Sequence, residues 1–320
     1  MPVWMLNLGT LSGAVLPVFI VIALGFWLRR VGMISATGGG ELARLTYWVG
    51  LPCQLFVVVA GTDLRVVFDL RSAAAAVGGF VIGLSLVLWF SRHLAAAERG
   101  SLSTGMCRAN AAFVGLPVVH LAAQTLAPEQ GAHLMAAFAV LIPVMVPAFN
   151  VGSTLGFLLP QHGMTRRGLI KVLAELPKNP LILASLAGVV VSLWRSGQGI
   201  GGTSGAVLVL LAGSATPLAL LATGAELNLS VMRAKPMLLV VACIGKLLLL
   251  PALTWVLGRA LGADPVALAA AVVLMACPAA VASGPMARQL GGDEAVVAAI
   301  IVATTLVAPV TLVMWLAVLT

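Results

Sequence analysis

The chain has 320 residues, of which 61% are hydrophobic and 9% are charged, and its formal net charge is +8. Ordinary soluble domains are roughly half apolar and a quarter charged, so this composition excludes a soluble globular protein and predicts one integral membrane domain. The basic residues lie in short loops between apolar runs, which argues against nucleic acid as a partner and favours membrane lipid.

Ten apolar runs fall along the chain at about the spacing of membrane spans, given that a hydrocarbon core of about 30 Å needs about 20 residues per helix, fewer where a helix is broken and more where it tilts. The predicted fold class is therefore an all-α integral membrane protein with about ten transmembrane helices. The first residues contain no basic stretch and no small-residue cleavage site, so no removable signal peptide is predicted. The predicted spans are Gly13–Trp27, Leu45–Gly61, Ser72–Phe90, Thr104–Ala123, Leu134–Leu159, Pro180–Trp194, Gly205–Gly224, Pro236–Leu261, Pro265–Ala287 and Ala295–Leu319.

Basic residues in the short loops predict the orientation, because cytoplasmic loops carry the excess of Lys and Arg. Alternate loops hold twelve and four of them, which places both termini outside the cytoplasm. The predicted location is the plasma membrane, the inner membrane in a bacterium. The twelve are Arg29, Arg30, Arg44, Arg92, Arg99, Arg166, Arg167, Lys171, Lys178, Arg233, Lys235 and Arg288, and the four are Arg65, Arg71, Arg195 and Arg259.

The longest connection divides the chain into two halves. We predict a first five-helix repeat over residues 1–160, a cytoplasmic linker over residues 161–179 and a second repeat over residues 180–320. Within the linker, leucine and valine recur at helical spacing beside basic residues, which suits a short helix on the inner leaflet.

Matching sequence motifs occur in the same order in the two halves of the chain. Pro17 and Gly25 in span 1 are eight residues apart, as are Pro180 and Gly188 in span 6. Because each half has an odd number of spans, the second half must be inverted relative to the first. Inverted repeats are typical of secondary transporters, whose substrate site lies near the midplane at the repeat interface.

Glycine and proline interrupt spans 4 and 9 near their middles, in Ser101–Gln124 and Ala276–Gly291. Freed backbone is tolerated at this depth only where it is buried in protein or lines a wet cavity. Paired interruptions in two halves point to a transporter's binding site. The candidate substrate-binding residues in these segments are Arg108, Asn110, Gly115, Pro117, Pro278 and Pro285.

Five polar residues of the spans each have a structural and a functional interpretation. Arg108 either reaches back to the interface or binds an anionic substrate through its guanidinium. Lys246, deeper in span 8, either pairs with an acid or backbone carbonyls, or replaces a coupling cation or titrates during transport. Asn110 bonds either a neighbouring helix or the substrate. Glu226 and Asp63, at span ends, are caps or carriers of the coupling ion.

The sequence contains no pattern for catalysis or for a cofactor. The four cysteines lie within or beside apolar runs and are predicted to be buried hydrophobes. The four histidines form no zinc motif, and the glycine runs at 38–40 and 199–202 lack the Lys and Ser/Thr of a P-loop. No nucleophile elbow is present. We therefore predict no enzyme activity, no metal, no cofactor and no ATP drive within this chain.

Several segments taken together resemble the auxin efflux carrier family. They are LPCQLF in span 2, NAAFVGLPVV in span 4, KNPLILASLAG opening the second half, IGKLLLLPAL in span 8, and MACPAAVASGPMARQLGGDEAVVAAIIVATTLVAPVTL. The resemblance implies two inverted five-helix repeats whose broken helices 4 and 9 cross, as in bile acid symporters and sodium/proton antiporters. It also implies transport of malonate, malate or related small organic anions, as in bacterial members.

The resemblance also implies site residues. Asn110 and Pro117 match the family's crossover in helix 4, and Pro278 matches the start of its helix-9 counterpart. Many members have an asparagine shortly after that proline, whereas this chain has Ala282 and Ser283. Ser283 is therefore the expected substitute for the missing amide.

These observations predict a secondary active transporter of a small organic anion, such as the dicarboxylates malonate or malate, that works by alternating access and is coupled to H+ or Na+. The alternatives are a carrier of auxin-like aromatic carboxylates, a relative of the bile acid/sodium symporters, and a membrane ligand sensor that does not transport. A homodimer is among the assemblies that the sequence allows.

Overall fold

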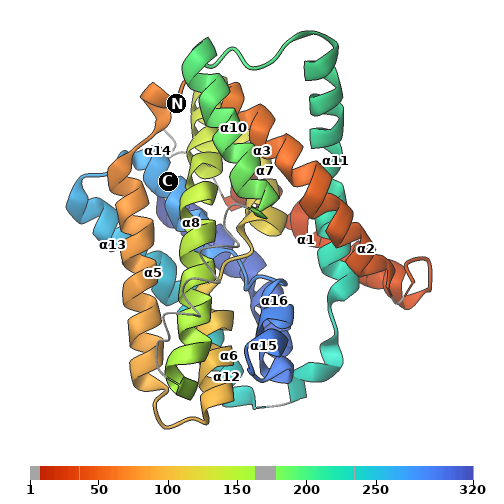
Figure 1. The fold of residues 1–320 in the computed structure, drawn as a ribbon, viewed down its shortest axis with the longest axis vertical. Helices are drawn as coiled ribbons and strands as arrows, with labels where there is room; N and C mark the ends of the chain where they lie inside the picture. The colour runs from red at the N-terminus through yellow and green to blue at the C-terminus, as the bar shows by residue number, and fades with distance from the viewer. Residues whose placement is uncertain (1–7, 36, 163–177, 234, 320) are drawn as a thin grey trace.

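The computed structural model describes residues 8–35, 37–162, 178–233 and 235–319. Within these ranges seven helices are long and apolar enough to cross a membrane, and three shorter apolar helices bring the spans to ten. The predicted all-α fold with ten spans is confirmed (Figure 1). The helices are α1 (Leu8–Arg30), α2 (Gly38–Leu45), α3 (Leu51–Ala60), α4 (Leu64–Val67), α5 (Leu70–Phe90), α6 (Ala96–Cys107), α7 (Leu116–Gln124), α8 (Pro128–His162), α10 (Pro180–Arg195), α11 (Gly202–Glu226), α12 (Pro236–Ile244), α13 (Leu250–Leu261), α14 (Pro265–Ala276), α15 (Ser283–Gln289) and α16 (Glu294–Leu319).

Spans 2 and 4 begin about two turns earlier than their hydropathy predicts. The helices start at Gly38 and Ala96, and each has an acid in its first turn, Glu41 or Glu98. A carboxylate there is favoured by the helix dipole, which a hydropathy profile ignores. As a consequence Arg44, predicted to lie in a loop, lies within α2. The inner-leaflet helix predicted within residues 161–179 falls largely outside the described residues.

Three spans contain a π-helical turn followed directly by Leu-Pro. Proline has no N–H and its ring clashes with the carbonyl four residues earlier, so a widened turn relieves the clash. In span 8 the carbonyl released by Pro251 is that of Leu247, and Trp315 Nε1 donates to it at 2.8 Å. The proline turns therefore release backbone acceptors inside the protein. The three turns are η2 (Thr46–Gly50), η3 (Ala111–Gly115) and η6 (Gly245–Leu249).

The spans divide into two groups that pack mainly within themselves. We call α1, α2–α3, α10 and α11 the panel, and α5 to α8 with α12 to α16 the crossover bundle. Figure 1 shows α1, α3, α10 and α11 in the upper part of the view, from the centre to the right, with α5 and α13 on the left and α8 down the middle. The groups meet where α1 packs on α7 and α16, and where α10 packs on α8.

The packing inside the panel repeats between the two halves of the chain. In α1, a Cβ at Gly25 would lie 2.3 Å from the carbonyl oxygen of Leu221 in span 7. In α10, a Cβ at Gly188 would lie 2.9 Å from the side chain of Val59 in span 2. The first helix of each half thus packs closely on the second helix of the other half. The glycine at each contact, Gly25 or Gly188, occupies the matching position in its half. Small residues permit such close helix contacts in membranes.

Gly224 in α11 gives a test of this packing. A Cβ at Gly224 would lie 1.9 Å from the carbonyl oxygen of Ile22 in α1. We expect Gly224→Ala to lower the stability of the detergent-solubilised protein by about 1 to 3 kcal/mol, because backbone must move to relieve the overlap. Gly213→Ala in the same helix is the matched control, since a Cβ there meets nothing within 4 Å. Equal melting temperatures for the two variants would contradict this packing.

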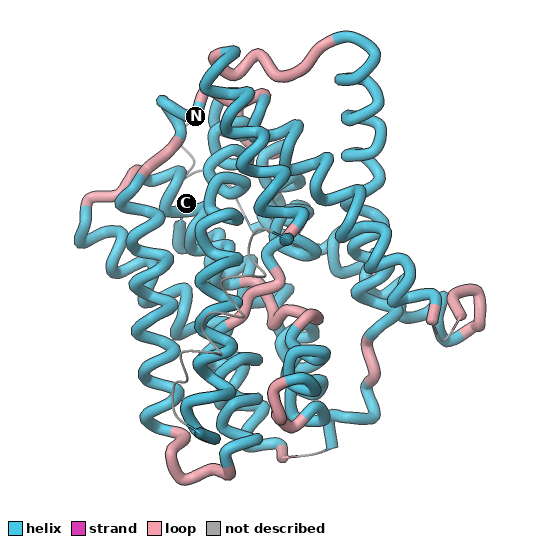
Figure 2. The backbone as a smooth tube through the Cα atoms, in the orientation of Figure 1, coloured by secondary structure: helices cyan, strands magenta, loops and turns pink. Residues whose placement is uncertain are grey.

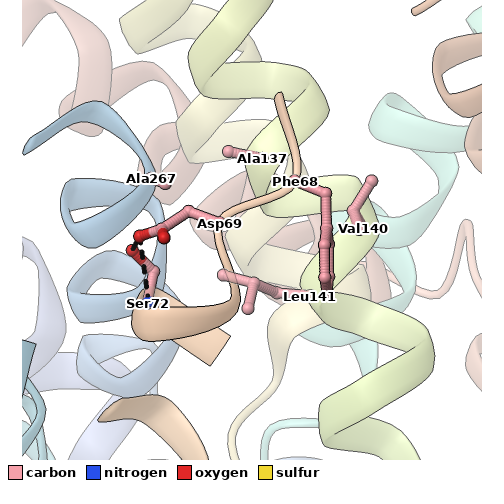
Figure 3. A pocket seen from close by; sticks show the side chains of 7 residues that line it. All are labelled: Phe68, Asp69, Ser72, Ala137, Val140, Leu141 and Ala267. Atoms are coloured by element: carbon pink, nitrogen blue, oxygen red, sulfur yellow. Dashed lines mark hydrogen bonds between the residues drawn. The ribbon is translucent and has the colours of Figure 1, made fainter. Parts of the chain in front are cut away.

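Asp69 holds the start of α5 to the start of α14. Its carboxylate accepts hydrogen bonds from the N–H groups of Arg71 (3.2 Å), Ser72 (3.0 Å) and Asp264 (3.0 Å), and from the Ser72 hydroxyl. Figure 3 shows Asp69 and Ser72 beside Ala267 of α14, at a small pocket. Partial burial raises the pKa of the Asp69 carboxyl, but the hydrogen bonds more than offset this, so the pKa lies below its ordinary value.

The stability contributed by Asp69 should therefore depend on pH. A depressed carboxyl pKa contributes stability that is present above the unfolded-state pKa of about 3.9 and is lost as pH falls through the folded-state value. We expect Asp69→Ala to cost about 1 to 2 kcal/mol at pH 7 and to weaken the acid dependence of the melting temperature. Asp63→Ala, which removes the cap of the one-turn helix α4, serves as the comparison. An unchanged acid dependence in Asp69→Ala would refute this role.

Candidate functional site

The two broken spans cross at their interruptions. One interruption lies between α6 and η3 and the other between α14 and α15. The main-chain N–H of Asn110 donates to the carbonyl of Pro278 at 2.8 Å, and the N–H of Ala280 donates to the carbonyl of Arg108 at 3.0 Å. Figure 2 shows these loops in the middle of the helical body. The crossing of helices 4 and 9 is confirmed, and each interruption satisfies backbone groups of the other.

The crossing brings together helix ends of opposite polarity. The C-terminal ends of α6 and α14 carry partial negative charge, whereas the N-terminal end of the segment Ala111–Gln124 carries partial positive charge. A cation is therefore favoured on one side of the crossing and an anion on the other.

Lys246 lies on the negative side. Its side chain is fully buried, and Nζ donates to the carbonyl of Met275 in the last turn of α14 at 2.7 Å. Cys107 and Cys277, at the ends of α6 and α14, lie close enough to interact with it electrostatically. No carboxylate among the described residues forms an ion pair with Lys246. The ammonium thus compensates two helix C-termini rather than an acidic side chain.

Two polar side chains at the crossing are buried without a hydrogen-bond partner. They are Asn110, 4% exposed, whose Nδ2 is unsatisfied, and Ser283, fully buried, whose Oγ is unsatisfied. An unpaired buried polar group costs about 1 to 3 kcal/mol, so native proteins retain few of them. Asn110 lines the cavity described below, and so do Ala282 and Gly284 on either side of Ser283. Asn110 could bond a ligand in the cavity, whereas Ser283 is not part of the lining and could do so only after its neighbours move.

Arg108 lies beside Asn110 and also lines the cavity. Its Nη1 donates to the sulfur of Met286 at 3.2 Å, and it forms no ion pair with a carboxylate in the described part of the chain. Tyr47, on η2 of the panel, is close enough to interact with it electrostatically. The guanidinium therefore retains donors for an anion in the cavity.

The cavity has a volume of about 1380 Å³ and lies between the panel and the crossover bundle. Five arginines from the described residues line it, whereas its acidic lining consists of Glu226, at the end of α11. A cleft lined mainly by one sign of charge concentrates ions of the opposite sign. The five arginines are Arg29, Arg30, Arg44, Arg108 and Arg288.

The remaining candidate residues occupy different places. Gly115 permits close packing, since a Cβ there would lie 2.5 Å from the ring of Phe138. Pro117 follows η3 and is buried, and Pro285 lies within α15. Asp63 caps α4 by accepting the N–H of Arg65 and is not part of the cavity lining. The structure thus gathers Arg108, Asn110, Pro278, Ser283 and Lys246 at the crossing, Glu226 along the cavity and Asp63 elsewhere.

Sequence reasoning missed several residues that line the cavity. Tyr47 is the chain's single tyrosine and comes shortly before the Leu-Pro of span 2, a signal that could have found it. The arginines of the lining act in the sequence as markers of orientation, and their spacing does not indicate that they border a cavity. The polar lining residues not predicted are Arg29, Arg30, Thr37, Arg44, Tyr47, Asn179, Thr223, Asn228 and Arg288.

A sequence profile described as membrane transport protein matches residues 10–316. The chain belongs to the membrane transport protein family. The resemblance to auxin efflux carriers is thereby confirmed, and the family supports a multi-pass membrane transporter. A further relative, an uncharacterized transporter of Methanothermobacter thermautotrophicus, is 26% identical over 226 residues, which are 68% of each chain.

Proposed function

We propose that this member of the membrane transport protein family is a secondary active transporter of a small organic anion. The observation that carries the proposal is the pair of buried, unsatisfied polar groups, Asn110 Nδ2 and Ser283 Oγ, beside the guanidinium of Arg108. An amide N–H, a hydroxyl and a guanidinium are all hydrogen-bond donors, and their residues lie at the crossing, where the N-terminal end of a helix favours negative charge. A carboxylate matches this set.

A dicarboxylate such as malonate or malate uses the site best. One carboxylate would bind Asn110 and Ser283, and the other would bind Arg108 in two parallel hydrogen bonds. Glu226 disfavours anions along one wall of the cavity. Arg108 and the other donors at the crossing therefore determine where an anion binds.

Alternating access follows from the division of the spans. The cavity has one wall on the panel and the other on the crossover bundle, so movement of one group against the other would close the present opening. The exposed residues of the lining, which mark the mouth, lie at the C-terminal end of α1, on α2, at the end of α11 and at α15, and most of the charged ones are basic. With both termini outside the cytoplasm, the opening faces inward across the plasma membrane.

The coupling ion that we propose is H+ rather than Na+. The ammonium of Lys246 already supplies a positive charge at the helix C-termini, where transporters with broken helices often coordinate a coupling cation. Glu226, which lines the cavity, is the candidate proton acceptor.

Uptake by reconstituted proteoliposomes tests this function. Radiolabelled malonate, malate and an aromatic carboxylate would be offered with an imposed H+ gradient, an imposed Na+ gradient or neither. We expect saturable malonate or malate flux that rises with the H+ gradient. Saturable binding without flux for every anion would favour a ligand sensor, and flux driven by Na+ alone would overturn the proposed coupling.

A further inference from the structure

The mouth of the cavity carries three arginines that the transport site does not use. Arg29 and Arg30 end α1, and Arg44 lies on α2, so all three belong to the panel. None of them forms an ion pair with a carboxylate among the residues that the structure describes. The guanidinium of Arg30 lies 5.1 Å from the ring centre of Phe26, which holds it in place without neutralising it. We call Arg29, Arg30 and Arg44 the mouth arginines.

The other two cavity arginines differ from the mouth arginines. Arg288 makes a two-point ion pair with Glu294, at 2.9 Å from Nε and 2.7 Å from Nη2, so its charge is already compensated. Arg108 belongs to the crossing. The exposed end of the cavity also holds Glu226, whose Oε1 would lie 3.9 Å from a Cβ at Gly40. Three guanidinium groups and one carboxylate thus lie at the mouth, which keeps a net positive charge, and one guanidinium lies at the crossing.

One face of span 2 connects these two places. Gly40, Arg44 and Tyr47 follow one another at intervals of four and three residues, which places them on one face of the helix, and all three line the cavity. Tyr47 in turn interacts electrostatically with Arg108. This face therefore joins the mouth to the crossing along one wall of the cavity, with Glu226 beside its first residue, Gly40.

The size of the cavity also exceeds what one small anion needs. Pockets for whole drug-sized ligands are about 300 to 1,000 Å³, whereas this cavity has about 1380 Å³. When one dicarboxylate is bound at the crossing, the mouth still has room for another anion.

We propose that the mouth arginines form a second anion-binding station, which captures di- and trivalent anions before they move to Arg108 and Asn110. This inference rests on the proposed function for the destination of the anion but not for its capture. Arg30 and Arg44 are exposed, so each contact is weak and screened by salt. Weak binding suits a station on a pathway, since an anion must be able to leave it.

Equilibrium binding of citrate to the purified protein tests the station separately from transport. The test variant is the triple Arg29→Gln/Arg30→Gln/Arg44→Gln. The control is Arg92→Gln/Arg195→Gln/Arg259→Gln, which removes the same charge from exposed arginines outside the cavity. At low ionic strength we expect the test variant to bind citrate about tenfold more weakly than the wild type, with the difference disappearing at high salt, and the control to bind normally.

The possible outcomes separate the two proposals. If citrate binding is absent in the wild type, is unchanged in the test variant or falls equally in the control, the station is refuted, whatever the transport assay gives. If salt-sensitive citrate binding is lost only in the test variant while no anion is transported, the station stands and the proposed function fails.

Discussion

Asn110→Ala is expected to reduce malonate or malate flux, measured as kcat/KM, by about 10- to 100-fold, because a hydrogen bond to a charged group contributes about 1.5 to 3 kcal/mol. The substitution removes the unsatisfied Nδ2 but retains the main-chain N–H that donates to Pro278. The crossing should therefore persist, and the melting temperature should change little. Flux is measured in proteoliposomes with protein of verified stability.

Asn110→Asp tests whether negative charge at this position opposes anion binding. It keeps the shape of the side chain but places an acceptor with negative charge where the substrate carboxylate would bind. We expect it to reduce flux more than Asn110→Ala does. If Asn110→Ala transports as well as the wild type, or if Asn110→Asp transports better than Asn110→Ala, the assignment of the anion to this position is wrong.

Lys246→Met is expected to reduce flux per folded molecule by at least about 100-fold, because it removes the cation at the C-terminal ends of α6 and α14. The carbonyl of Met275 also loses its donor, so the melting temperature should fall as well. The wild-type ammonium is fully buried and donates to the carbonyl of Met275. Without it the C-terminal ends of α6 and α14 face each other without a cation. Flux and melting temperature are measured on the same preparations.

The two readouts distinguish a structural from a functional role of Lys246. A purely structural lysine would give a lower melting temperature together with normal flux per folded molecule. That result would refute the proposed part of Lys246 in transport. Lys246→Arg keeps the charge, and we expect it to retain more flux than Lys246→Met.

Much of the fold could be predicted because proline and glycine act locally. The pairing of Gly25 with Gly188 indicated the inverted repeat, and both glycines lie at equivalent helix contacts. The interruptions of spans 4 and 9 indicated the crossing in the same way. Hydropathy predicts the starts of spans 2 and 4 too late, because the polar first turns that begin at Gly38 and Ala96 are helical.

The site was less predictable because its contacts are distant in sequence or involve the main chain. Lys246 bonds a carbonyl 29 residues away, and no side-chain pattern encodes that partner. Tyr47 and Arg44 join the cavity only because the panel packs beside the crossover bundle. Asp63 and Glu226 looked alike as acids at span ends, yet one caps a helix and the other lines the cavity.

The shared hydrogen bonds between the two interruptions restrict how the transporter can move. Since Asn110 bonds Pro278 and Ala280 bonds Arg108, the two loops cannot separate without exposing four backbone groups. If the protein works as proposed, Arg108 and Asn110 should therefore move together with the residues around Pro278, whereas the mouth arginines should stay with the panel. The distance between Arg44 and Arg108 should therefore change during the transport cycle. Paired spin labels at the two positions would measure that change.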